Sequence, residues 1–202
     1  MSTEENILLA ARKVFLQKGF MSARMQEIAD EAGINKALLH YYFRTKEKLF
    51  EQIFSDAFQL IKQSFTGSLL NSLTFSEFLR AFVHAYLHLL DQMPYLPQFI
   101  LQELNRDSSR IITLFEQQKV PMSAIKKLIA TEVENGEIIA IKPEHLIVNI
   151  ISLIVFPFVA RPIIKTFIFN QNIEDYSRFN EGRGEEIVQF ILRAIRIPKN
   201  MI

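Results

Sequence analysis

Residues 27–48 constrain this chain more than any other stretch, because they read as two short helices joined by a tight turn. Apolar residues between positions 28 and 32 recur at helical spacing and give the first helix an apolar stripe. Gly33 then ends that helix, since glycine is the usual residue just beyond a helix end. Asn35 is a good N-cap for the second helix. The stretch therefore predicts a helix, a glycine turn and a second helix.

The second helix of this pair is predicted to have one apolar side and one basic side. Its predicted buried stripe consists of Leu38, Leu39, Tyr42 and Phe43. Lys36, His40 and Arg44 lie four residues apart and share a ridge on the other side. Such a pair is the helix-turn-helix pattern, which places its second helix in the major groove of DNA. An ordinary helical hairpin with a charged, solvated face is the alternative interpretation.

The segments on either side of this pair favour the first interpretation. Residues 3–18 are predicted to form a preceding helix that Gly19 stops, and Ser22 or Ala23 is expected to open the next one. Thr45 is an N-cap for a long following helix, predicted over residues 45–66 with apolar residues along one face.

A set of residue types at fixed spacing identifies the family that this part of the chain resembles. The set comprises Ala10, Ala11, Phe15, Gly19 and Phe20, then Ile28, Ala29, Ala32, Gly33 and Ile34, and finally Phe43, Lys46, Glu47 and Leu49. On these residues, positions 6–54 resemble the TetR family of bacterial transcriptional regulators. So many matches over about 50 residues are far more specific than any single motif.

Four positions depart from the family pattern: Arg24, Ala37, Leu38 and His40. All four lie in the second helix of the pair or on its flank. They therefore bear on the DNA sequence that is recognised more than on the fold. Leu38 cannot hydrogen-bond a base edge but could touch a thymine methyl group or pack inward.

The resemblance implies double-stranded DNA as a partner and suggests a role for each matching position. The expected DNA-binding residues are Arg24, Asn35, Lys36, Ala37, His40, Tyr41, Tyr42 and Lys46. Lys46 is expected to contact a phosphate, helped by the free N–H groups at the start of its helix, and Arg24 and Tyr42 to contact the backbone. Lys36 and His40 are the candidates for base edges, with Ala37 and Tyr41 beside them.

The composition restricts where and how such a chain works. Its 202 residues suffice for one helical domain with a good core, or for two small ones that share a helix. The absence of cysteine excludes disulfides and cysteine-based sites, and fits a reducing cytoplasm. The first ten residues lack the pattern of a signal peptide. The net charge is only +1, so the DNA hypothesis depends on the motif.

The remaining helices follow from apolar periodicity. They are predicted over residues 75–91, 98–105, 108–119, 122–135, 144–168 and 185–196. The helix over 144–168 is the most apolar, and Pro157 and Pro162 should kink it or end it early. Its apolar run of 15 residues is shorter than the ~20 that a membrane span needs, so no membrane partner is expected.

The helices at about 144–168 and 185–196 resemble the pair with which TetR-family subunits usually dimerise as a four-helix bundle. A homodimer through these helices is therefore implied. A twofold dimer presents two recognition helices about one DNA turn, ~34 Å, apart and so reads a palindrome. The resemblance also implies a repressor that a small-molecule effector releases from DNA.

In the family, the effector occupies a pocket among the middle helices and the penultimate one. The candidate pocket residues here are Phe82, Tyr86, Phe99, Gln102, Glu103, Phe115, Asn149, Ser152 and Phe156. Asn149, Ser152 and Phe156 share a stripe with two polar groups among apolar walls, as ligand pockets have. We expect an apolar effector, aromatic or lipid-like. Alternatively, the phenylalanines are plain core and Asn149 faces a partner or water.

Other classes of function have less support. No nucleophile motif, glycine-rich phosphate loop or set of metal ligands is visible, so neither an enzyme nor a cofactor is expected. His84 and His88 have one possible metal spacing, but nothing nearby completes the set and both lie on a charged face. An effector-free DNA-binding protein of the same fold, architectural or division-linked, remains an alternative.

The sequence thus predicts an all-α protein with two domains. Residues 1–48 should form a three-helix, helix-turn-helix DNA-binding domain. Residues 49–202 should form a larger helical domain for effector binding and dimerisation.

Overall fold

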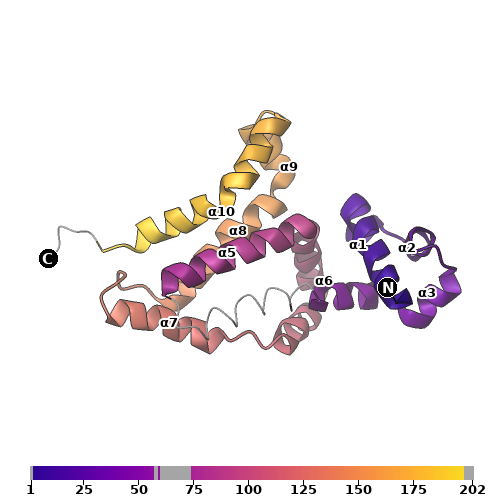
Figure 1. Ribbon diagram of the computed structural model, residues 1–202, viewed down its shortest axis with the longest axis horizontal. Coiled ribbons are helices and arrows are strands. Elements are labelled where there is room, and N and C mark those ends of the chain that lie inside the picture. The colour runs from indigo at the N-terminus through magenta and orange to yellow at the C-terminus, as the bar shows by residue number, and fades with distance from the viewer. Residues whose placement is uncertain (1, 57–58, 60–73, 198–202) are drawn as a thin grey trace. The chain divides into compact units, whose positions relative to one another are not determined.

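The computed structural model describes residues 2–56, 59 and 74–197 of the chain (Figure 1). Every named element within this described part is a helix, which confirms the predicted all-α class. Extended pairing in the same part is limited to an isolated antiparallel bridge between Ile138 and Arg196.

Contacts between residues divide the chain into two compact units. The first unit takes its residues from 1–60 and 89–119, and the second takes its residues from 61–88 and 120–202. The N-terminal helices therefore share a unit with a helix from the middle of the chain.

The first unit begins with three helices and continues with two further helical segments. They are α1 (Thr3–Ser22), α2 (Met25–Glu31), α3 (Lys36–Tyr42), the helical residues 46–56 and α6 (Leu96–Gln117). The part of the predicted 45–66 helix beyond residue 59 lies outside the described residues.

Two helix ends in this unit differ from the prediction. Gly19 has the non-helical backbone angles φ 75° and ψ 161°, so it kinks α1, and the chain resumes helical structure up to Ser22. The predicted end at Gly19 is thus a kink, because one glycine with positive φ redirects the chain without stopping it. The start of α2 is also later than predicted, with Arg24 as its N-cap in place of Ser22 or Ala23.

The turn between α2 and α3 is built as the sequence predicts. Gly33 has φ 66° and its N–H donates to the Asp30 carbonyl at 3.1 Å, while the Ile34 N–H donates to the Ala29 carbonyl at 3.0 Å. This pair of bonds is a Schellman motif, which satisfies the last carbonyl groups of α2. The Asn35 side chain then accepts a 2.8 Å hydrogen bond from the Leu38 N–H and caps α3.

An aromatic core joins the N-terminal helices to α6. The Phe99 ring of α6 lies 3.7 Å from the Phe50 ring and 4.3 Å from the Phe20 ring, centroid to centroid. Phe15 contacts Phe20 and Phe50, and Tyr95 packs against Phe15 at 5.8 Å. Aromatic side chains carry much apolar area, so this cluster holds the first unit together.

The helix α6 is continuous where the sequence predicted two pieces. Its described backbone runs unbroken through residues 106 and 107, which the prediction assigned to a connection. Polar residues in that stretch weaken the apolar pattern without changing the backbone's helical preference, so the break was wrong.

The second unit contains most of the remaining helices. They are α5 (Phe75–Gln92), whose last turn belongs to the first unit, α7 (Met122–Glu134), α8 (Pro143–Val159), α9 (Arg161–Ile163), η1 (Ile164–Ile168) and α10 (Ile173–Ile195). The predicted helix over 144–168 is bent by 67° between α8 and the α9–η1 segment. Pro157 lies in the last turn of α8 and Pro162 in α9, which confirms that the prolines interrupt it.

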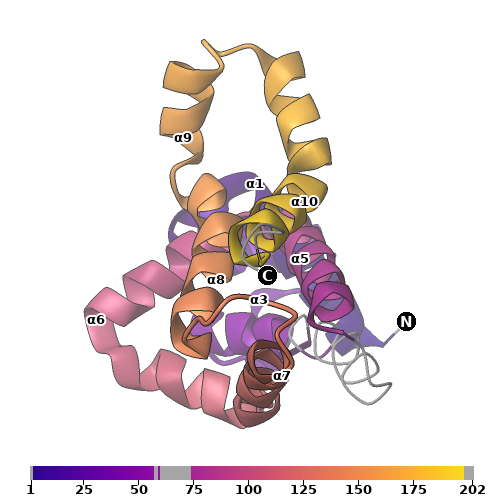
Figure 2. The same ribbon diagram turned by 90° about the vertical axis from the view of Figure 1, so that its left-hand side faces the viewer.

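A hairpin extends from the end of α8, and we call residues 160–179 the distal hairpin (Figure 2). Its two arms are the α9–η1 segment and the first half of α10. They enclose a small core of Ala160, Ile164, Phe169, Tyr176 and Phe179. The Lys165 ammonium lies 4.6 Å from the centroid of the Tyr176 ring, and this cation–π contact connects the two arms of the hairpin.

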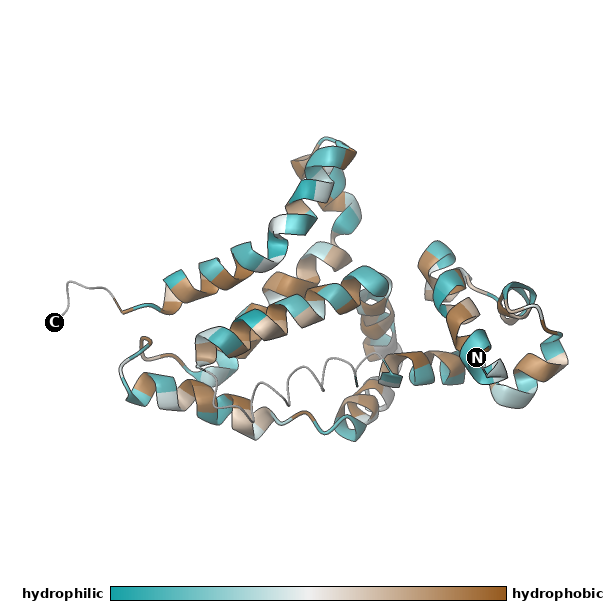
Figure 3. Ribbon diagram, in the orientation of Figure 1, coloured by the Kyte–Doolittle hydropathy of each residue, from teal (hydrophilic) through white to brown (hydrophobic). Residues whose placement is uncertain are grey.

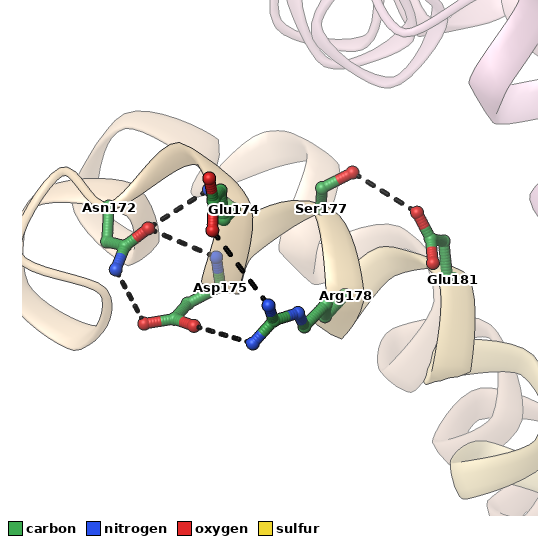
Figure 4. A network of polar contacts seen from close by, with 6 residues as sticks. All are labelled: Asn172, Glu174, Asp175, Ser177, Arg178 and Glu181. Carbon is green, nitrogen blue, oxygen red and sulfur yellow. Dashed lines mark hydrogen bonds and ion pairs between the residues drawn. The ribbon is translucent and has the colours of Figure 1, made fainter.

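The first half of α10 was not predicted, because residues 170–184 are polar and rich in turn formers. Asn172 caps the helix by accepting hydrogen bonds from the N–H groups of Glu174 and Asp175, at 3.0 and 3.2 Å. Its amide also donates to Asp175, and Arg178 forms ion pairs with both acidic residues (Figure 4). The cap and the hairpin core start the helix at Ile173, before the apolar pattern that predicted its second half.

Among the described residues, no single helix is long and apolar enough to cross a membrane. The bent pair of α8 and the α9–η1 segment reaches the required length and apolar composition only when its two parts are taken together. Figure 3 shows the apolar residues of α8 beside the alternating apolar and polar residues of α10.

Candidate nucleic-acid interface

Helix α3 presents nearly all of its side chains to solvent. In this seven-residue helix Leu39 is the buried residue, with none of its surface exposed. The exposed side chains are Lys36, Ala37, Leu38, His40, Tyr41 and Tyr42. The predicted burial is confirmed for Leu39 and Phe43 and is wrong for Leu38 and Tyr42. The helix α3 is anchored in its unit by Leu39 and by its C-cap residue, Phe43, which are both buried. The other side chains of α3 are therefore accessible to a partner.

The two aromatic residues at the end of α3 form a pair on this surface. The Tyr41 side chain is 81% exposed and its ring lies 5.4 Å from the Tyr42 ring, edge to face. Each ring thus restricts the other without being buried. A rigid exposed pair with two hydroxyl groups can pack against sugars and donate to phosphates.

His40 has its tautomer fixed by the backbone. Its Nδ1 atom lies 3.1 Å from the carbonyl oxygen of Arg44. A carbonyl oxygen can only accept, so Nδ1 carries the proton and donates it. In the neutral ring, Nε2 is then a hydrogen-bond acceptor on the exposed side of the helix. An acceptor there matches the amino group of adenine or cytosine in the major groove.

Arg24 occupies the N-cap of α2, and its side chain is exposed. Its backbone N–H donates to a carboxylate oxygen of Glu27 at 3.0 Å. Glu27 also accepts a 2.8 Å hydrogen bond from the Lys18 ammonium. The Lys18 contact, followed by the Arg24 backbone bond, lowers the pKa of Glu27. The charged carboxylate therefore fixes the start of α2 while the Arg24 guanidinium remains on the surface.

Lys46 is placed differently from the expectation. Its ammonium donates to three backbone carbonyls, those of Phe20, Ala23 and Met21, at 2.7, 2.9 and 3.2 Å. It also lies 4.6 Å from the centroid of the Phe20 ring. Burial lowers the pKa of this half-buried lysine. An ammonium group has three N–H donors, and all three are used within the protein.

The candidate effector residues are distributed over both units. In the first unit, Phe99 lies within the aromatic core and is 2% exposed. The Phe115 ring lies 5.6 Å from the Phe54 ring, centroid to centroid, and the Gln102 side chain is exposed. The side chain of Glu103 lies outside the described part.

In the second unit, the candidates Phe82 and Tyr86 form an aromatic pair on α5. Their ring centroids are 5.7 Å apart. Burial raises the pKa of Tyr86 to about 12, so its phenol stays protonated and can donate a hydrogen bond.

The remaining effector candidates, Asn149, Ser152 and Phe156, lie on the exposed side of α8. Phe156 is 62% exposed, and Val148 beside Asn149 is 61% exposed. Side chains with this exposure are less typical of a pocket wall within one chain than of a surface that a second chain covers. In a single chain, the Asn149 side chain therefore faces solvent.

His84 has a packing role that its spacing from His88 does not suggest. A Cβ atom added at Gly184 of α10 would lie 2.7 Å from Cε1 of the His84 ring. The imidazole therefore lies directly against the α10 backbone, and a larger residue at position 184 would require this exposed ring to move. In the described part, no group of three or more His, Cys, Asp or Glu residues is placed to hold a metal ion.

Known proteins are similar to this chain in sequence and in fold. The family described as "Bacterial regulatory proteins, tetR family" matches residues 7–53. A probable HTH-type transcriptional regulator of Bacillus subtilis, YttP, is 28% identical over 97% of this chain and 95% of its own length. HlyIIR, a hemolysin II transcriptional regulator, has the same fold with a TM-score of 0.65, 23% identity, and coverage of 97% of this chain and 98% of its own.

A further solved structure, that of AibR in complex with isovaleryl coenzyme A and operator DNA, covers 78% of this chain and 86% of its own. Its TM-score is 0.65 and its identity 16%. YttP and HlyIIR are both named as transcriptional regulators. Residues 7–53 thus match the TetR family of bacterial transcriptional regulators, and the likeness to named transcriptional regulators extends over the rest of the chain in sequence and in fold.

Proposed function

We propose that this protein is a repressor that binds a palindromic DNA operator as a homodimer and is released by an apolar small molecule. The single observation that carries the DNA-binding part is the exposure of α3. Six of its seven side chains are exposed, and the seventh, Leu39, anchors the helix. A helix that serves mainly as core would bury a continuous stripe instead. Such a regulator would act in the cytoplasm, where bacterial DNA lies.

The proposed DNA contacts follow from the positions of the exposed side chains. Lys36 and His40 lie one helical turn apart and would read base edges, with Ala37 and Tyr41 beside them. Arg24 and Tyr42 would contact the sugar-phosphate backbone. Asn35 uses its side-chain oxygen to cap α3, which leaves its amide group to donate to a phosphate.

The proposed dimer surface is the exposed apolar side of α8 and α10. Val148, Phe156 and Phe190 are each more than half exposed, although each is large and apolar. In the distal hairpin, Ile163 and Phe167 are also large, apolar and exposed, and Phe167 is 79% exposed. Exposed apolar side chains gathered on neighbouring elements mark interaction surfaces. A second copy related by a twofold axis would cover them and pair two α3 helices for a palindrome.

The two proposed domains have separate roles. Residues 1–48 would bind DNA, and residues 49–202 would bind the effector and dimerise. AibR, a neighbour in fold, was solved with an acyl-coenzyme A ligand and operator DNA. For this chain we propose Phe82 and Tyr86 as apolar and hydrogen-bonding contacts to an effector. Phe99 would connect α6 to the DNA-binding helices, because it packs on Phe20 and Phe50.

Selection of a random duplex library on the purified protein, at two salt concentrations, tests this proposal. The expected result is a palindromic motif whose affinity falls steeply with salt. Lys36→Ala should relax the preference at one position of each half-site. Failure to enrich any motif would contradict the proposal, provided that mass spectrometry of the denatured sample shows no co-purified inducer.

The effector can be tested on the selected duplex. A panel of aromatic, fatty-acyl and acyl-coenzyme A compounds should include one that raises the melting temperature of the free protein and weakens operator binding. If no compound in the panel does both, the effector part of the proposal fails while the DNA-binding part stands.

A further inference from the structure

Lys46 connects the two ends of the helix-turn-helix unit. The chain enters α2 directly after Ala23 and leaves α3 at Phe43, three residues before Lys46. The Lys46 ammonium bonds the carbonyls of Phe20, Met21 and Ala23, so one side chain joins the entrance of this unit to its exit. These bonds span 23 to 26 positions of the sequence, and they close residues 24–45 into a loop.

The surroundings of the ammonium favour a permanent bond over a transient one. Phe20 and Ala23 are buried, and their carbonyl oxygens are partly buried, so they need a donor in place of water. The Phe20 ring supplies a second attraction for the cation, at 4.6 Å. The same ring packs against Phe15, Phe50 and Phe99, and this anchors the closed loop to the core of the unit.

A lysine held in this way cannot also serve a phosphate without breaking its bonds. Turning the ammonium outward would leave three carbonyl oxygens without this donor, two of them on buried residues. The start of the 46–56 helix has its own donors for an anion, namely its first backbone N–H groups.

We propose that Lys46 is a positioning residue, which holds α3 at a fixed orientation by closing the helix-turn-helix unit, and that it is not a phosphate contact. This inference rests on the proposed DNA-binding function. It departs from the role that the family resemblance implied for the same residue.

Three variants separate the two roles. Lys46→Met keeps the length of the apolar stem and removes the charge and donors. Lys46→Arg keeps the charge, but a planar guanidinium cannot direct its donors to three converging carbonyls as an ammonium does. Lys36→Ala removes an exposed cation that the proposed function assigns to base edges, so it should lower the preference for operator over random duplex without changing the melting temperature.

The readouts are the melting temperature without DNA, the affinity for operator and for random duplex, and the slope of log affinity against log salt. If Lys46 closes the unit, Lys46→Met and Lys46→Arg lower the melting temperature by about 5–10 °C. At a temperature well below melting, both variants bind operator roughly 10-fold or more weakly and random duplex with little change. Their salt slope stays within about 0.3 of the wild-type value, since no phosphate contact is lost.

A phosphate contact predicts the opposite pattern, which would overturn the inference. The slope would then fall by about 0.9 in Lys46→Met, affinity for all duplexes would fall together, and Lys46→Arg would bind like the wild type. A purely structural lysine would lower the melting temperature without changing the ratio of operator to random affinity, and this too would count against positioning.

The two proposals can fail separately. If the wild type binds no duplex, the proposed function fails, whereas the closure is still tested by the melting temperatures and by hydrogen exchange of the amides of residues 20–28. Unchanged melting and exchange in both Lys46 variants would exclude the closure, whatever happens to DNA binding.

Discussion

At the residue scale, single side chains fix the geometry of the first unit through contacts that are far apart in sequence. Phe99 is 2% exposed and packs against Phe20 and Phe50, which precede it by 79 and 49 positions. Glu27 joins α1 to α2 through Lys18.

Phe99→Ala should destabilise the protein by about 3–5 kcal/mol, because it removes a ring from a tight aromatic core and leaves a cavity. Chemical denaturation measures this change. Leu101→Ala is the control on the same helix; its side chain is 43% exposed, so its loss should cost less than about 0.5 kcal/mol. Equal effects of the two substitutions would mean that Phe99 does not pack into the core.

The pH dependence of stability should contain a contribution from Glu27. Its pKa is lowered in the folded protein by the Lys18 hydrogen bond and the Arg24 backbone bond. The stabilisation is therefore complete above the unfolded pKa, near 4.5, and is lost as pH falls through the lower folded value.

Melting curves between pH 3 and pH 7 check this expectation. Glu27→Gln should melt lower than the wild type at pH 7, and the difference should shrink as the pH approaches 3. Glu4→Gln, the same change at an exposed position of α1, is the control for replacing a carboxylate by an amide. A constant difference between Glu27→Gln and wild type at every pH would refute the charged interaction.

At the element scale, helix ends and glycines decide the course of the chain. Gly33 ends α2 with φ 66°, and Gly19 bends α1 with φ 75°. Gly182 and Gly184 lie inside α10 instead, and a Cβ atom at Gly184 would collide with His84. The same residue type thus serves as a turn, a kink and a close contact.

Gly33→Ala and Gly182→Ala should have opposite effects on stability. A Cβ atom meets nothing within 4 Å at either position, so only the backbone differs. At Gly33 the positive φ makes alanine destabilising by about 1–2 kcal/mol. Within α10, alanine should stabilise by about 0.5–1 kcal/mol. Thermal melting of the two variants tests both signs, and a stabilised Gly33→Ala protein would contradict the turn geometry.

At the scale of the whole molecule, we propose that the exposed apolar residues on α8, α10 and the distal hairpin form the surface of a homodimer. Phe156→Glu places a charge on the proposed dimer surface and should convert the dimer into a folded monomer. Operator affinity should fall by roughly 100-fold or more, because two linked half-sites become one.

Sedimentation analysis and operator binding measure these effects together. Ile112→Glu, at a half-exposed position of α6 outside the proposed surface, should remain dimeric and bind operator normally. A Phe156→Glu protein that stays dimeric would remove α8 from the dimer surface.

Much of the fold could be read from the sequence, because the signals that begin and end its helices are local. Gly33, Asn35 and Thr45 act on groups within four residues of themselves, so their roles as helix end and N-caps were predictable. The prolines that interrupt the 144–168 segment, and the apolar periodicity of α5 and α7, are local in the same sense. The family resemblance of residues 6–54 also depends only on residue types at fixed spacing.

Only the tertiary structure decided which face of each helix is covered. Leu38 and Tyr42 fit an apolar stripe, yet they are exposed because α3 touches the rest of its unit through Leu39 and Phe43. The start of α10 depends on the core of the distal hairpin, and the position of Lys46 depends on carbonyls at least 23 positions away. Helix formation is a property of neighbouring residues, whereas burial and hydrogen-bond partners depend on segments that only the folded chain brings together.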